Sequence, residues 1–199
     1  VDYTHPDLKA SLWINQQEIS EMVWEIILDL GADLNSDGYM SSLEIENFLI
    51  IAGMDNNADG EINLRDLVYE NTDNVFGAST SVFLDGVDQD GNGYTDDLIG
   101  WDPSGYLGVD DPDPYPREDA TSNSTWAHGT HVAGILGATT DNDLGMSSAS
   151  YNAKIMSVKS SRDYQQTDPG VNDGYAGITY AAKAGYYSGT FTIINNSWG

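Results

Sequence analysis

The chain has 199 residues, 40% of them hydrophobic, with 32 acidic residues against only 7 Lys and Arg and a formal net charge of −25. Such an acidic surface repels nucleic acid and anionic membranes. The sequence also lacks the run of about eighteen apolar residues that would span a bilayer. We therefore expect no nucleic-acid partner and no membrane partner. The chain contains no cysteine, which excludes disulfides, thiolate metal sites and a thiol nucleophile.

The first part of the chain predicts a small helical segment. Residues 18–32 carry apolar side chains at helical spacing, and residues 43–54 form a second helical stretch. Each stretch leads into a short loop rich in Asp, Asn and Gly, at 33–44 and 55–66. We expect residues 18–82 to form an EF-hand-like or dockerin-like insertion in a larger domain.

The last third of the chain alternates between helix and strand patterns. The sequence predicts a buried helix starting at or near His128, a buried strand at 153–159, a helix at 172–185 and a strand at 190–195. Such alternation with short connections is typical of an α/β fold with a doubly wound, mostly parallel sheet. The loops between the first helices carry the clearest chemical motif.

Two of the acidic loops match the calcium-binding pattern D-x-[DN]-x-[DN]-G-x5-E, which presents oxygen ligands at positions 1, 3, 5, 7, 9 and 12. Turns without metal are the alternative, but two such loops in tandem with helical flanks favour Ca²⁺. The first loop offers Asp33, Asn35, Asp37, the Tyr39 carbonyl, Ser41 and Glu44, and the second offers Asp55, Asn57, Asp59, the Glu61 carbonyl, Asn63 and Asp66.

A third acidic loop lies within residues 85–97 and follows the same pattern without an acid at position twelve. A calcium ion there would be structural, because nothing in the sequence indicates the Met-rich groove of a calcium sensor. Its candidate ligands are Asp88, Asp90, Asn92, the Tyr94 carbonyl, Asp96 and Asp97.

The stretch His128–Gly129–Thr130–His131 has three interpretations. A zinc pair is disfavoured, because zinc helices usually carry H-E-x-x-H and no cysteine is present to complete a site. Two histidines at a helix start could also be purely structural. A general base held at a rigid helix end is favoured, since an apolar run follows and Gly129 permits close backbone approach.

This stretch and several other segments of the chain resemble the subtilisin-like serine proteases, or subtilases. "HGTHVAGILGA" is similar to their histidine motif, which implies that His128 is the catalytic base and His131 a buried structural partner. "VDYTHPDL" resembles the stretch after the catalytic aspartate, and "DGVDQDGNGYTDDLIGWD" resembles a loop of calcium-dependent bacterial members. The resemblance covers residues 1–17 and 83–199 and leaves 18–82 outside the common core.

Two further segments take roles from the resemblance. "IINNSWG" is similar to the family's Ser-x-Gly strand, so Ser197, Trp198 and Gly199 would pair with the substrate backbone. "ATTDNDLGM" is similar to a calcium loop of the family. The ligands it implies are the carbonyls of Thr139, Leu144 and Met146, the Asn142 side chain and the Asp7 carboxylate.

We therefore expect part of a secreted, calcium-stabilised serine endopeptidase that acts on polypeptides. The family pattern implies a triad Asp before Val1 and a triad Ser after Gly199, so residues 1–199 alone should be inactive. The rival hypothesis is a non-catalytic calcium-binding module on a degenerate subtilase scaffold. The paired loops leave open a protein partner for the insertion.

Overall fold

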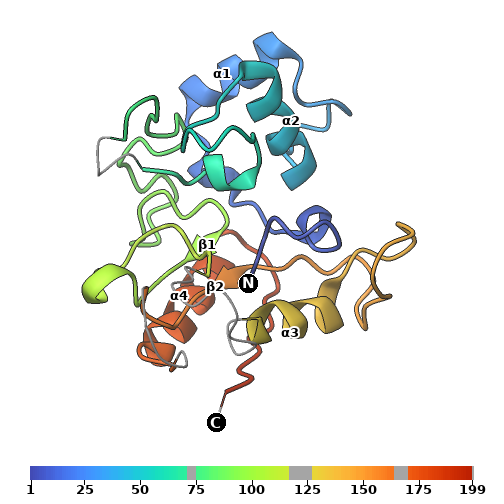
Figure 1. Cartoon of the computed structure of the whole chain (residues 1–199), viewed down its shortest axis with the longest axis vertical. Helices are drawn as coiled ribbons and strands as arrows, with labels where there is room; N and C mark the ends of the chain where they lie inside the picture. The colour runs from blue at the N-terminus through green and yellow to red at the C-terminus, as the bar shows by residue number, and fades with distance from the viewer. Residues whose placement is uncertain (71–74, 117–126, 164–169, 199) are drawn as a thin grey trace.

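The computed structural model describes residues 1–70, 75–116, 127–163 and 170–198, which form the helical and α/β parts seen in Figure 1. Four α-helices and two strands occur in this part of the chain, with short 3-10 turns between them. The elements are α1 (Glu21–Leu30), α2 (Ser42–Ala52), β1 (Gly100–Trp101), α3 (His128–Gly137), β2 (Ser157–Val158) and α4 (Gly174–Tyr187), with the turns η1 (Lys9–Ser11), η2 (Gln16–Glu18), η3 (Leu64–Asp66) and η4 (Tyr106–Gly108).

The four predicted helices are confirmed, although the helix that begins at His128 was predicted to be buried and only Ala133 and Gly137 in it are. The first two helices have clear end signals. The Ser20 side chain accepts a hydrogen bond from the backbone at the start of α1, and α1 ends at Gly31 in the left-handed conformation. Helix α2 begins with a capping box between Ser41 and Glu44 and ends at Gly53. These caps satisfy backbone groups that a short helix leaves unpaired.

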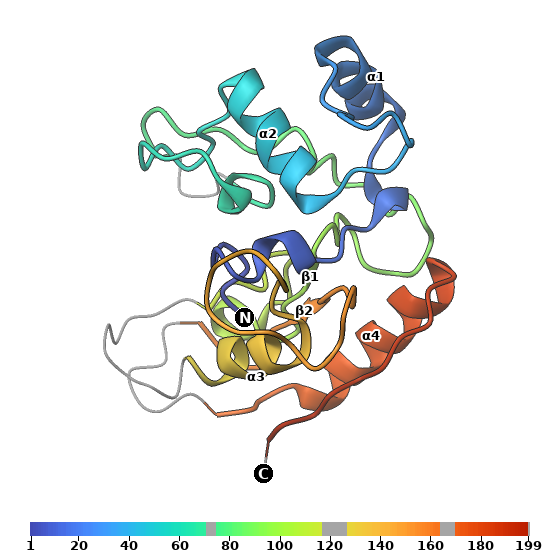
Figure 2. The same cartoon turned by 90° about the vertical axis from the view of Figure 1, so that its right-hand side faces the viewer.

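Helices α1 and α2 lie at one end of the molecule and pack on a core that also includes residues from the flanking segments (Figures 1 and 2). Phe48 of α2 meets Phe83 edge to face, with ring centroids 5.5 Å apart. The same core contains Ile14, Leu98 and Ile99, which precede or follow the helical segment. Residues 18–82 are therefore fused to the rest of the chain through shared apolar burial, which stabilises both parts.

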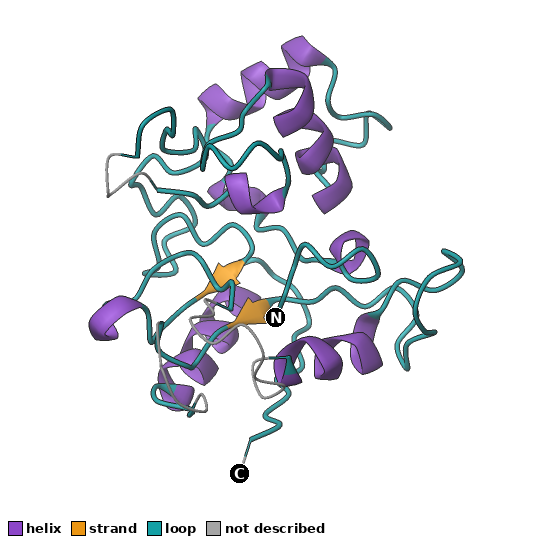
Figure 3. Cartoon of the chain, viewed as in Figure 1, coloured by secondary structure: helices purple, strands orange, loops and turns teal. Residues whose placement is uncertain are grey.

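The sheet consists of β1 and β2, which pair in parallel with Gly100 opposite Ser157 (Figure 3). Leu12 forms a further, isolated parallel bridge with Ile155, which lies just before β2 in the sequence. Gly100 has a φ of +141°, and a Cβ there would collide with the Ser157 carbonyl, so the pairing requires glycine. On one side Trp101 stacks on Tyr180 of α4, with ring centroids 6.1 Å apart.

The parallel α/β arrangement is confirmed, but the described strands are shorter and fewer than a doubly wound sheet predicts. Of the strand predicted at 153–159, only β2 forms. The prediction of a strand at 190–195 is wrong. That segment runs as a loop along α4 (Figure 2) and leaves Phe191 and Ile193 80–90% exposed. A strand needs a neighbour to accept its backbone hydrogen bonds, and among the described residues none lies beside it.

No helix in the described part of the chain is both long and apolar enough to cross a bilayer.

Candidate catalytic helix and calcium loops

His128 opens helix α3, and its side chain is exposed. The start of the chain packs against the first turn of this helix, where the Asp2 amide donates a hydrogen bond of 2.8 Å to Thr130 Oγ1. A Cβ on Gly129 would lie 3.8 Å from the Val1 nitrogen, an ordinary van der Waals contact, so this packing does not itself require glycine. The helix thus holds His128 at an accessible end, beside the first residues of the chain.

The structure corrects the prediction that His131 is buried, because its side chain is exposed. Residues three apart share a helix face, so His131 faces the same way as His128. It lines a cavity of about 240 Å³ together with His5 and Tyr115. Within the described residues, no hydrogen bond joins His128 to a carboxylate or a serine.

The residues predicted to bind substrate lie at the other end of the chain. Ser197 Oγ accepts a hydrogen bond of 2.9 Å from the Asn195 side chain. The Trp198 indole packs against Gly174 at the start of α4, where a Cβ would come within 3.0 Å of the ring. Gly199 lies outside the described residues.

The two predicted EF-hand-like loops have the same internal hydrogen bonds. In each, the glycine at position six donates to the carboxylate at position one, from Gly38 to Asp33 at 3.0 Å and from Gly60 to Asp55 at 3.1 Å. The amide at position five donates to the asparagine at position three, to Asn35 and to Asn57 at 3.0 Å each. Two loops that differ in sequence therefore fold the same way around their position-one carboxylates.

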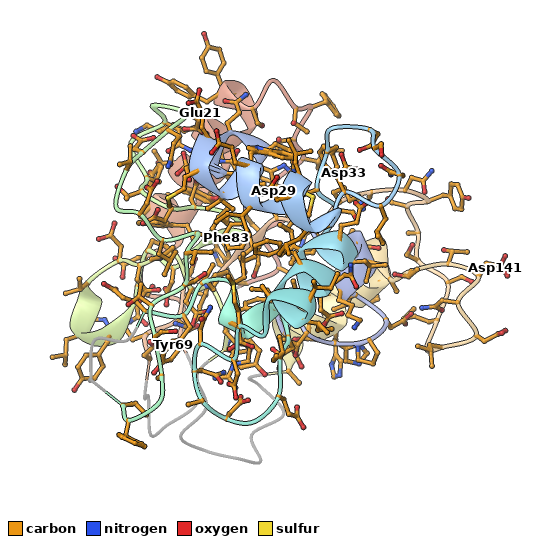
Figure 4. All side chains as sticks on the ribbon, turned by 90° about the horizontal axis from the view of Figure 1, so that it is seen from above. Glu21, Asp29, Asp33, Tyr69, Phe83 and Asp141 are labelled. Atoms are coloured by element: carbon orange, nitrogen blue, oxygen red, sulfur yellow. The ribbon has the colours of Figure 1, made fainter. Side chains whose placement is uncertain are left out.

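An oxygen of the first loop is well placed for a cation. Asp33 lies in the loop after α1 (Figure 4), and its Oδ1 atom is buried without a hydrogen-bond partner in the described structure. A buried carboxylate oxygen without a donor is costly unless a cation satisfies it. Glu44 closes the loop, since its oxygens accept from Leu34 at 3.1 Å and from Ser41 at 3.0 Å. These donor types suit Ca²⁺, which prefers carboxylate and carbonyl oxygens.

The third loop has the same hydrogen-bond pattern as the first two. The Gly93 amide donates to Asp88 at 2.8 Å, and the Asn92 amide donates to Asp90 at 2.8 Å. The Asp96 carboxylate instead accepts from the amides of Asp85 and Gly86. The carboxylates that come together are Asp90, Asp97 and Glu18, and Glu18 belongs to η2, far away in the sequence.

Burial dominates the electrostatics of this third group. It raises the pKa of Glu18 to about 8, and the negative charges of Asp97 and Asp90 add to the shift. Burial likewise raises the pKa of Asp97 to about 7, against interactions with Tyr180, Asn92 and Asn15 that favour its charged form. A divalent cation would reverse both shifts by stabilising the carboxylates.

The predicted loop at 139–146 surrounds Asp7 and borders a cavity of about 320 Å³. Asn142 Nδ2 donates to Asp7 at 2.9 Å, and the Met146 amide donates to it at 3.1 Å. Gly145 has a φ of +47°, and a Cβ there would collide with the Asp7 carboxylate. The loop, which projects from the molecule near Asp141 in Figure 4, brings together the acid, the amide side chain and the backbone that the resemblance implies.

A further acidic group surrounds Lys159. Asp102 and Asp163 both form ion pairs with the Lys159 ammonium, which is nearly fully buried. Asp111 lies in the same group, and burial together with the charges of Asp102 and Asp113 raises its pKa to about 7. Because a lysine already compensates these acids, we assign them to structure and not to metal binding.

Glu18 and Asn15 are the site residues that sequence reasoning missed. Asn15 Nδ2 donates to Asp90 at 3.0 Å and to Asp97 at 2.9 Å. Both residues lie about seventy positions before the third loop, and only Glu18 falls at the start of a predicted helix. The one available signal was Ile99 at position twelve, where the pattern requires an acid and therefore predicts a donor from elsewhere.

The fold and site define a chain of the α/β class, with a histidine at an exposed helix end and acidic loops that could hold a metal. The model of the subtilase family matches residues 1–199, so the chain belongs to the subtilase family. Over 74 residues it is 36% identical to the extracellular basic protease of Dichelobacter nodosus; the match covers 37% of this chain and 11% of that protein. The chain thus spans only a small part of this curated relative, and no solved structure matches it.

Proposed function

We propose that the chain is part of a secreted, calcium-stabilised serine endopeptidase that hydrolyses peptide bonds. The observation that carries this proposal is His128, an exposed side chain at the first residue of α3 in a chain matched throughout by the subtilase family. An imidazole that is accessible and fixed by a helix suits a general base. The similarity to an extracellular basic protease of Dichelobacter nodosus supports an extracellular location and a protease activity.

In this proposal His128 takes a proton from the serine nucleophile and returns it to the leaving amine, and a carboxylate orients the imidazole. The acid and the serine belong to parts of the protein outside residues 1–199. The packing of Val1 and Asp2 beside Gly129 and Thr130 favours an acid just upstream, since such a residue would lie close to His128. Residues 197–199 bind the substrate backbone.

Replacement of His128 in the full-length protein tests the catalytic assignment. We expect H128A to lower kcat by about 10⁴-fold or more and to abolish labelling by a fluorophosphonate probe, because the serine loses its base. The exposed His131 is the matched control, and H131A should retain most of the activity. Equal loss in both variants, or undiminished labelling of H128A, would refute the role of His128. A separate piece of residues 1–199 should not label.

We also propose that Ca²⁺ stabilises the protein, at the loops of residues 33–44, 55–66 and 88–97 and at the Asp7 loop of residues 139–146. The repeated loop geometry and the orphaned Asp33 oxygen support this assignment. A cation that binds only the folded state adds stability by mass action, so removal of Ca²⁺ with EDTA should lower Tm. An unchanged Tm would contradict all the calcium assignments.

The alternative, a non-catalytic calcium-binding interaction module, is favoured by one observation. Apolar side chains on α1 and α2 are exposed, among them Leu28 at 64% and Ile50 at 54%. Exposed apolar groups that cluster can mark a protein-binding surface. A full-length protein that neither labels with the probe nor cleaves a denatured protein substrate would favour this function.

A further inference from the structure

The third calcium loop lacks its closing acid in the sequence, and the structure supplies one from elsewhere. In the first loop the amide at position nine, Ser41, donates to Glu44 at 3.0 Å. In the second loop the same position, Asn63, donates to Asp66 at 2.9 Å. The closing acid at position twelve is thus recognised by the amide of position nine.

Glu18 accepts the equivalent bond in the third loop. The amide at position nine, Asp96, donates to Glu18 Oε2 at 3.1 Å. The amide at position three, Asp90, donates to Glu18 Oε1 at 3.0 Å, as Asn57 of the second loop donates to Asp66 at 3.1 Å. Both oxygens of Glu18 are therefore held as the closing acid of an EF-hand-like loop is held, although Glu18 belongs to η2.

Glu18 also completes a group of three carboxylates. Glu18, Asp90 and Asp97 each offer an oxygen within 4.8 Å of the others. Glu18 and Asp97 are fully buried, and no Lys or Arg forms an ion pair with any of the three within the described residues. The contrast with the group around Lys159, where an ammonium balances the acids, indicates that a cation is needed here.

A buried hydroxyl points independently to a ligand in this group. Tyr180 of α4 is fully buried, and its hydroxyl interacts with the Asp97 carboxylate without forming a hydrogen bond of standard geometry. After burial, the charge of Asp97 and its interaction with the hydroxyl are the main causes that raise the pKa of Tyr180, and the charges of Asp90 and Glu18 add to them. A buried hydroxyl that lies beside a carboxylate without a well-formed hydrogen bond is unusual, and an ion or an ion-bound water between the carboxylates would satisfy it.

We propose that Glu18 is the closing, bidentate carboxylate of a Ca²⁺ site on the third loop, with Asp88, Asp90, Asn92 and Asp97 as further ligands. Asn15 hydrogen-bonds to two of these carboxylates and so holds them in position. The proposal rests on the calcium-binding part of the proposed function. It adds that residues 15–18, at the start of the helical segment, belong to the same metal site as the loop before β1.

The test is a comparison of the purified protein with E18Q, and with E25Q as a matched control on the exposed face of α1. Bound Ca²⁺ is counted by equilibrium dialysis. Terbium luminescence is excited through tryptophan, since Trp101 contacts Tyr94 of the loop with ring centroids 5.2 Å apart. We expect E18Q to lose one Ca²⁺, or to bind it at least about tenfold more weakly, and to lose the luminescence. E25Q should match the wild type.

A stability measurement distinguishes a Ca²⁺ ligand role of Glu18 from a purely structural role. In EDTA, E18Q should be at least as stable as the wild type, because it removes one of three buried like charges. In Ca²⁺ the order should reverse. Retention of the full Ca²⁺ count by E18Q, or an equal loss of stability with and without Ca²⁺, would overturn the inference and leave the other calcium loops standing. Absence of Ca²⁺ binding by the wild type would overturn both.

Discussion

The ion cluster around Lys159 should be the most sensitive point of the α/β part. Lys159 is 6% exposed, and its ammonium pairs with Asp102 and Asp163, which are also buried. The K159M substitution keeps the length of the side chain and removes the charge. Two buried carboxylates then lose the positive charge that compensates them in a low-dielectric interior, which typically costs about 3–5 kcal/mol.

For a chain of this size, each kcal/mol lost lowers Tm by roughly 2–4 °C, so K159M should melt roughly 6–20 °C below the wild type. The control is K154M, since Lys154 lies on the same segment but is exposed and donates only to the Ala10 carbonyl. Urea unfolding at constant Ca²⁺, followed by circular dichroism, gives the free energies directly. The control should lose about 1 kcal/mol or less.

The loss should also depend on pH. Burial already raises the pKa of Asp102, and removal of the ammonium raises it further. A carboxyl group with a raised pKa in the folded state destabilises the protein as pH rises above its unfolded pKa, so the penalty of K159M should shrink in acid. The double variant D102N/K159M should recover part of the stability at neutral pH. A K159M protein within 1 kcal/mol of the wild type, or a penalty that grows in acid, would refute this reasoning.

Three further outcomes are expected. G145A should destabilise the protein by about 1–3 kcal/mol and weaken Ca²⁺ binding at the Asp7 loop, because of its positive φ and the collision of its Cβ with Asp7; urea midpoints with and without Ca²⁺ check this. The stability of the wild type should fall as pH rises from the ordinary 3.8 of Asp111 through its raised pKa of about 7, and D111N should flatten this part of a plot of urea midpoint against pH. E44Q should keep the α2 cap, since Gln also completes a capping box, yet lose the stabilisation by Ca²⁺ at the first loop, as thermal melts in EDTA and in Ca²⁺ would reveal.

Local patterns predicted the helices well because their signals are local. The stripes of α1 and α2 come with serine caps and terminal glycines, and these determine where each helix begins and ends. Strands depend on partners, so the apolar run 190–195 predicted a strand that the described structure does not form. The burial predicted for His131 failed for a similar reason, since it depends on what covers the face of α3 that carries His128.

The candidate site divides in the same way. The loops of residues 33–44, 55–66 and 88–97 could be proposed as calcium loops from the sequence, because their candidate ligands are spaced along one stretch of chain. Glu18 and Asn15 could not be assigned, since only folding brings them to the third loop. The missing acid at position twelve, Ile99, marked the gap without indicating what fills it.

The placement of Glu18 gives the third loop a role in the architecture. Glu18 directly precedes Ile19, which is in the large core with the helical segment, and the loop runs directly into Leu98 and Ile99 of that core and then into β1. Tyr180 faces the same acids from α4 and stacks on Trp101 of β1. A cation among these carboxylates would therefore contact the start of the helical segment and the entry to β1, and would lie beside the helix that covers β1. Loss of that one ion should loosen the junction between the two parts before it unfolds either one, because each part retains its own apolar packing.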